Sequence, residues 1–189
     1  MHWWYPNDIE HLYICGFSDY NCDRLTFPNN SFNQLKSISI GYYCFQHVRE
    51  FVIDGLESLE SVQIGKECFR IDYGERDDGI CRITNCPNLC QLDIGDESFR
   101  DFKSFELSNV NSLQSIKFGI CCFKYADFSL KGEWKERKKC DLNENENDVL
   151  DLPSLEIVTF GEYSFSRCHV AVFESMWWLF IFISHSRSS

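Results

Sequence analysis

The sequence lacks any segment long enough to carry the chain across a membrane as a helix. Its longest apolar run is MWWLFIFI, the eight residues 176–183, whereas a spanning helix needs about 20. The start, MHWWYPNDIEHLYICG, has no basic region, no long apolar core and no small-residue cleavage site. We therefore expect a cytoplasmic protein and consider a membrane anchor at 176–183 the less favoured alternative.

Basic residues are also scarce. The chain has 18 Lys and Arg against 29 Asp and Glu, which gives a net charge of −11. Because an acidic surface repels phosphate groups, we do not expect nucleic acid as a partner.

Motifs for catalysis are absent as well. The sequence contains no G-x-S-x-G elbow, no H-E-x-x-H pair and no phosphate-binding loop. Its five histidines, at positions 2, 11, 47, 169 and 185, share no regular spacing. Pairs of acids such as Asp96-Glu97 fall in expected turns, where acidic side chains are ordinarily solvated. We expect no enzymatic activity and no cofactor.

What the sequence does contain is a repeat. The pattern L-x-x-[I/L/V]-x-[I/F]-G-x-x-[C/S]-F occurs five times, as LKSISIGYYCF, LESVQIGKECF, LCQLDIGDESF, LQSIKFGICCF and LEIVTFGEYSF. Its glycines stand at 41, 65, 95, 119 and 161, so two steps are 24 residues long and the others are 30 and 42. This spacing predicts units of about 24 residues, with insertions at about 70–79 and 133–150. Such charged insertions are most often solvated loops, and the alternative is a projecting contact loop.

A second short pattern lies between the copies, as FVIDGLESL, CRITNCPNL and FELSNVNSL. Both patterns alternate apolar and polar residues over a few positions, which predicts two short strands in each unit. The recurring glycine indicates a corner that needs either a positive φ or a close backbone approach. Stacked units would align three apolar columns: Phe45, Phe69, Phe99, Phe123 and Phe165; Leu35, Leu59, Leu89, Leu113 and Leu155; and Ile40, Ile64, Ile94, Phe118 and Phe160.

The repeat also accounts for most of the 11 cysteines. Cys81, Cys86 and Cys90 have a spacing that could suggest zinc, but Cys81 aligns with Phe51 and Phe105, so it occupies a core position. The residue before the last Phe of each copy is Cys44, Cys68, Ser98, Cys122 or Ser164, which indicates a position for a small side chain. We expect buried thiols and no metal, with disulfides as the less favoured alternative.

The copies, above all FGEYSFSRC from Phe160 to Cys168, resemble the BspA-like leucine-rich repeats, whose usual segment is I-G-x-x-A-F-x-x-C. The resemblance covers residues 25 to about 173, and it departs from the family by placing Cys or Ser where Ala is usual. It implies a right-handed solenoid with parallel sheets that serves as a binding or adhesion surface.

We therefore expect a mainly β leucine-rich-repeat solenoid with two short parallel strands per unit. It would have an irregular cap at 1–24, repeats over 25–175 and an apolar, then polar, tail at 176–189. The expected function is a non-catalytic scaffold that binds a protein, and the alternative is a structural fragment of a larger surface or adhesion protein. Candidate binding residues point outward from the strands: Ser39, Gln63, Asp93, Lys117 and Thr159 on the second strand of each unit, and Arg82 and Glu106 on the first.

Overall fold

The computed structural model describes residues 8–17, 22–71, 79–131, 154–168, 171–173 and 180–183. Most of the insertion predicted at 70–79 and all of the one at 133–150 lie outside this part of the chain, so neither loop prediction is tested.

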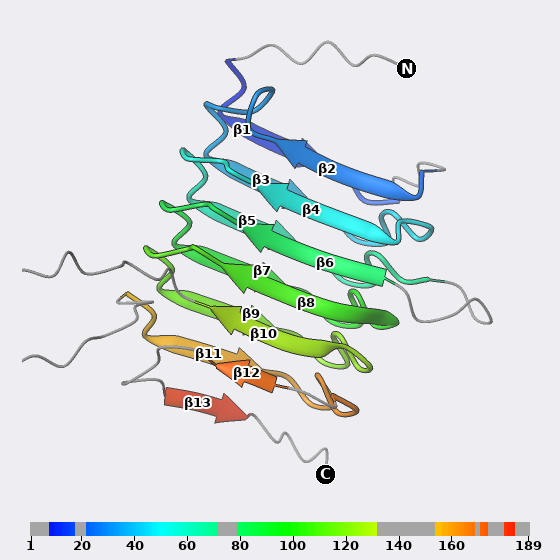
Figure 1. The fold of residues 1–189 in the computed structure, drawn as a ribbon. Helices are drawn as coiled ribbons and strands as arrows, with labels where there is room; N and C mark the ends of the chain where they lie inside the picture. Colours follow the sequence, from blue (N-terminus) through cyan, green and yellow to red (C-terminus); the bar gives the residue numbers. More distant parts are fainter. Residues whose placement is uncertain are drawn as a thin grey trace, which may run out of the picture.

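Two parallel sheets make up the described structure, which contains no helix in these residues (Figure 1). Sheet A contains, in spatial order, β1 (His11–Ile14), β3 (Ser37–Ile40), β5 (Ser61–Ile64), β7 (Gln91–Ile94), β9 (Ser115–Phe118), β11 (Ile157–Phe160) and β13 (Phe180–Ile183). Sheet B contains β2 (Arg24–Pro28), β4 (Glu50–Asp54), β6 (Gly79–Thr84), β8 (Phe102–Ser108), β10 (Asp127–Lys131) and β12 (Ala171–Phe173). The chain alternates between the sheets, and each new strand pairs in parallel with the strand one turn earlier. The predicted β-solenoid with two short parallel strands per turn is confirmed.

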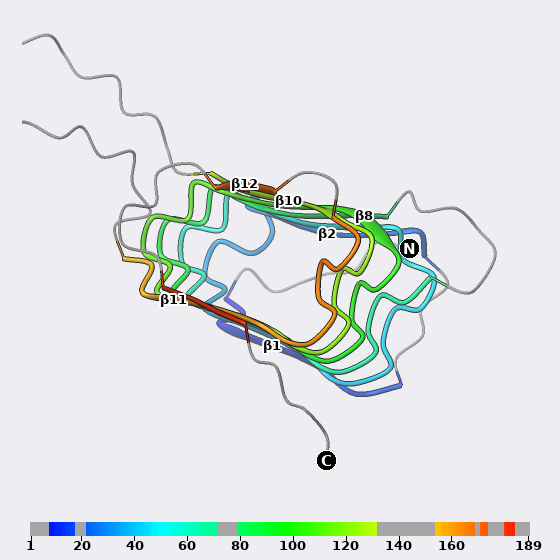
Figure 2. The same cartoon turned by 90° about the horizontal axis from the view of Figure 1, so that it is seen from below.

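The pairing register places equivalent residues of successive copies over one another. Ile40 pairs with Ile64, Ile64 with Ile94, and the column continues through Phe118 to Phe160, as predicted. In β3 and β5 every second residue is buried and points into the space between the two sheets, and Figure 2 shows these sheets as two layers. The apolar core fills this space.

Regular structure begins earlier and ends later than the sequence predicts. Strand β1 lies inside 1–24, the predicted irregular cap, and pairs in register with β3. Its half-buried Leu12 and Ile14 pack against the core, and this alternation is what allows a full turn to form there. Strand β13 lies inside the predicted tail and pairs with β11. Strand pairing therefore extends into the segments predicted as the cap and the tail.

A column of stacked phenylalanine rings runs through the core. The centroids are 5.3 Å apart for Phe45 and Phe69, 4.5 Å for Phe69 and Phe99, 4.8 Å for Phe99 and Phe123, and 5.3 Å for Phe123 and Phe165. The rings of each pair are within 17° of parallel. Each pair contributes about 0.5–1.5 kcal/mol beyond its buried area. The predicted leucine column is also buried, with exposures from 0% for Leu35 to 8% for Leu155.

Each of these phenylalanines has a left-handed backbone conformation, with φ between 47° and 58°. This conformation costs a non-glycine residue about 1–3 kcal/mol. It is retained because it turns the ring back beneath the corner and into the core, where burial of a large side chain contributes a comparable free energy.

The glycine that follows each of the strands β3, β5, β7, β9 and β11 is required by close backbone approach. A Cβ atom on Gly65 or Gly95 would lie 2.7 or 2.6 Å from the carbonyl carbon of the preceding corner's glycine. Real Cβ atoms essentially never approach other atoms this closely, and no positive φ accompanies these glycines. By the register of β1, the first residue of this column is Cys15, and within the described chain no turn of the solenoid precedes it. A side chain is therefore tolerated only where no earlier corner lies beneath it.

The Gly95→Ala substitution should lower the free energy of unfolding by about 3 kcal/mol, because the added methyl group overlaps the backbone of the previous corner. Gly16→Ala is the control, since its Cβ would lie 3.1 Å or more from its neighbours, the nearest being the ring of Tyr42. Urea denaturation of both variants measures the difference. Equal losses of stability would contradict the close-approach explanation.

Candidate binding surface

The outer face of sheet A gathers five of the predicted binding residues into one column. The register places Ser39, Gln63, Asp93, Lys117 and Thr159 directly over one another, and Tyr13 of β1 extends the column. Gln63 and Lys117 are exposed, whereas the other three predicted residues are half-buried. The predicted alignment of these side chains is thus present.

A parallel column on the same face contains mostly short polar side chains: His11, Ser37, Ser61, Gln91, Ser115 and Ile157. The two columns together make a flat strip. Within the described residues, the side chains of Ser39, Ser61 and Gln63 form no hydrogen bond with the protein. Their donors and acceptors therefore face solvent.

On the outer face of sheet B several charged side chains pair with one another, as Asp93 and Lys117 do at 3.7 Å on sheet A. Arg24 contacts Glu50 at 2.6 Å, and Arg82 contacts Glu106 at 3.0 Å. Asp54 accepts hydrogen bonds of 2.7 Å from the Thr84 hydroxyl and from the Asn85 amide. The remaining predicted residues, Arg82 and Glu106, lie on this face, across the core from the other five (Figure 2). The seven candidates are therefore divided between two surfaces and do not form one site.

A chain of polar contacts follows the glycine corner of sheet A. The Tyr43 hydroxyl donates to Glu67 at 2.6 Å, and Arg70 lies 3.1 Å from Glu67 and 3.4 Å from Glu97. In the neighbouring column Lys66 contacts Asp96 at 2.7 Å. The hydrogen bond from Lys66 lowers the pKa of the Asp96 carboxyl, and the hydrogen bond to Glu67 raises the pKa of the Tyr43 phenol. Both pairs thus remain in the protonation states that favour their contacts.

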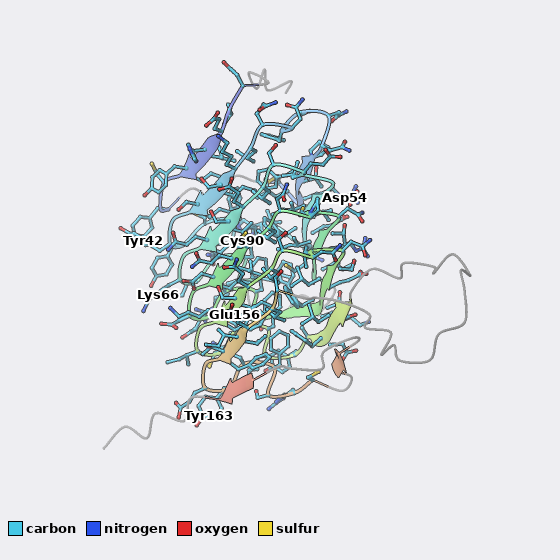
Figure 3. The ribbon with its side chains drawn as sticks, turned by 90° about the vertical axis from the view of Figure 1, so that its left-hand side faces the viewer. Tyr42, Asp54, Lys66, Cys90, Glu156 and Tyr163 are labelled. Carbon is cyan, nitrogen blue, oxygen red and sulfur yellow. The ribbon has the colours of Figure 1, made fainter. Side chains whose placement is uncertain are left out.

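An exposed aromatic cluster at this corner was not predicted from the sequence. Figure 3 shows Tyr42 projecting from the same edge as Lys66. Tyr42 and Tyr43 are 51% and 41% exposed, and Phe17, which contacts both rings, is 68% exposed. The sequence signal for this cluster was the segment GYYCF, the single copy of the repeat with two aromatic residues after its glycine. The copies GKECF and GDESF have charged residues at these positions.

The small residue before each core phenylalanine proves to be a hydrogen-bond donor. Cys68 donates to the Gly41 carbonyl at 2.8 Å, and Ser98 donates to the Gly65 carbonyl at 2.7 Å. The same contact recurs from Cys122 to Gly95 at 3.0 Å and from Ser164 to Gly119 at 2.6 Å. The position therefore selects a small donor, a stricter requirement than the small size predicted from the sequence.

Burial suppresses the acidity of these thiols. It raises the pKa of Cys68 and of Cys122 to about 12, and that of Cys86 to about 11. The predicted core positions of Cys81 and Cys86 are confirmed, because both side chains are fully buried. No group of three or more His, Cys, Asp or Glu side chains suited to a metal ion occurs among the described residues.

In comparisons with protein-family models, with curated proteins and with solved structures, nothing matched this chain. A search of the described residues for a helix with the length and apolar character of a membrane span found none.

Replacing Cys68 by Ala should lower the free energy of unfolding by about 1 kcal/mol, since the Gly41 carbonyl loses its thiol donor. Cys68→Ser should retain most of the stability, because a hydroxyl stands in the same position at Ser98 and Ser164. Chemical denaturation at pH 7 distinguishes the two variants. If the Ala and Ser variants were equally destabilised, the small size of the side chain alone would explain why Cys and Ser occur at this position of the repeat.

The stability of the fold should also decrease in alkaline solution. A thiol with a raised pKa in the folded state stays protonated while the unfolded chain ionises, so its contribution is complete below about pH 8.5 and declines towards pH 12. The loss is roughly 1.4 kcal/mol for each thiol and each pH unit in that interval. The double variant Cys68→Ser, Cys122→Ser should lose less stability than the natural chain between pH 8 and pH 10 in urea titrations. Parallel losses in the two proteins would refute this account of the alkaline sensitivity.

Proposed function

We propose that the chain is a non-catalytic scaffold that binds a protein partner through the outer face of sheet A. The observation that carries the proposal is the flat strip on sheet A, where uncharged polar side chains of successive strands stand in register. Charged pairs form on both faces, but on sheet A Ser39, Ser61 and Gln63 present polar groups that the described protein does not use. A partner can satisfy these groups without first breaking internal contacts.

The shape of the face also supports this role. Parallel strands joined by tight corners hold the side chains at fixed spacing, so little conformational entropy is lost when a partner binds. Sheet A has six strands from β1 to β11, and each of them is four residues long. At the usual strand spacing and rise per residue, they form a strip of roughly 24 by 13 Å. This area is well below the ~800 Å² per partner of a typical stable interface. We infer that a partner also contacts residues next to the strip.

We further propose that the chain belongs with the BspA-like leucine-rich repeats. The support is the recurring I-G-x-x-[C/S]-F segment together with the glycine corner and the buried phenylalanine that follows it. Cys and Ser at the usual Ala position are accounted for by their hydrogen bonds to the preceding corner. In this family such surfaces are typically used for binding or adhesion.

Site-specific photocrosslinking tests the proposed face. A photoreactive amino acid at Gln63 should capture a partner protein from an extract of the native source, whereas one at Arg82, exposed on sheet B, should not. Gln63→Arg should reduce recovery of that partner about tenfold, corresponding to about 1.4 kcal/mol, because it places a long charged side chain on a flat strip. Arg82→Gln is the matched control and should leave recovery unchanged. Capture from Arg82 alone would move the binding surface to sheet B.

A further inference from the structure

The aromatic cluster at the corners that follow β1 and β3 consists of Phe17, Tyr42 and Tyr43. The ring of Phe17 stacks on that of Tyr43, with centroids 5.4 Å apart and planes within 2°. It meets Tyr42 edge to face at 5.0 Å. Although the three rings contact one another, between 41% and 68% of each residue remains exposed.

Stability alone does not account for these residues. Phe17 and Tyr43 adopt left-handed backbone conformations, with φ of 59° and 56°, which aromatic residues adopt at a cost. The core phenylalanines offset this cost by burial, whereas 41% to 68% of each cluster residue is exposed. At the position of Tyr43, the next two corners have Glu67 and Glu97 with the same left-handed φ, and the corner after β11 has Tyr163. Clustered exposed aromatic side chains of this kind are characteristic of contact surfaces.

The electrostatic environment indicates which partner group the cluster would attract. Tyr43 donates its hydroxyl hydrogen to Glu67 at 2.6 Å, which makes the ring richer in electrons and a better acceptor for a cation. At the next corner Lys66 is held by Asp96, and Arg70 is held between Glu67 and Glu97. The protein as a whole carries a net charge of −11. Charge complementarity therefore favours a cationic group.

We propose that the cluster of Phe17, Tyr42 and Tyr43 binds an arginine side chain from an extended segment of the protein partner. A planar guanidinium stacks on aromatic rings and retains its charge when partly desolvated, so it suits this surface better than the compact ammonium group of lysine. The cluster lies at the corners that follow β1 and β3, beside the strip on sheet A. The inference rests on the proposed protein-binding role, and it supplies contact area that the strip alone lacks.

The test uses a fluorescein-labelled peptide of repeated arginine, glycine and serine, added to the full chain at physiological ionic strength. A second peptide with glutamine in place of each arginine controls for the backbone, and one with lysine controls for charge. Fluorescence anisotropy should show binding of the arginine peptide in preference to both controls. Tyr42→Ala or Phe17→Ala should weaken that binding about fivefold. Tyr163→Ala should leave it unchanged, because Tyr163 is 65% exposed at the corner that ends β11, near the other end of the solenoid.

The proposal would be overturned if the arginine and lysine peptides bound equally well, or if Tyr42→Ala and Tyr163→Ala weakened binding equally. Either result would mean that the peptide responds only to the overall acidity of the protein. Circular dichroism of each variant confirms that the solenoid is intact. Photocrosslinking from Gln63 is independent of the cluster. If a partner were captured there while the peptides failed to bind, the arginine inference would fail and the proposed function would stand.

Discussion

At the corner after each strand of sheet A, the backbones of successive turns approach so closely that no Cβ atom fits between them. The glycine column from Gly41 to Gly161 provides this space. With the corners in contact, the strands reach hydrogen-bonding distance and the register of every column follows. A side chain at one corner would separate two turns and weaken strand pairing on both sides of it. The solenoid therefore depends on this one steric constraint.

Two further features depend on the same contact. The thiols and hydroxyls of Cys68, Ser98 and their equivalents reach the glycine carbonyl of the preceding corner, which holds the corners in place. The left-handed turn that follows directs each phenylalanine into the stack of rings. Because a buried thiol keeps its proton, cysteine and serine can alternate in this column. The high cysteine content of the chain thus has a largely structural explanation.

The regular backbone leaves the outward positions unconstrained. Both faces pair some charged side chains across adjacent strands, arginine with glutamate on sheet B and Asp93 with Lys117 on sheet A. Sheet A presents short polar side chains, with an exposed aromatic cluster beside it. Short side chains lose little entropy on binding, and aromatic rings supply most of the apolar contact in protein interfaces. The proposed roles of both surfaces follow from this division.

The sequence by itself determined the repeat, the two strands of each unit and the buried columns, because a two-residue alternation and a recurring glycine reflect local chemistry. It did not reveal that β1 completes a turn within the first 24 residues, since the copy there has Cys15 where the others have glycine. It assigned Arg82 and Glu106 to the first strand of each unit and the other five candidates to the second, without deciding between the two faces. Only the stacking of turns decided which outward residues share a face, which carbonyl each thiol meets, and how Phe17 contacts Tyr42 and Tyr43. These contacts join residues that lie about one full turn apart along the chain, and local sequence patterns do not encode such distances.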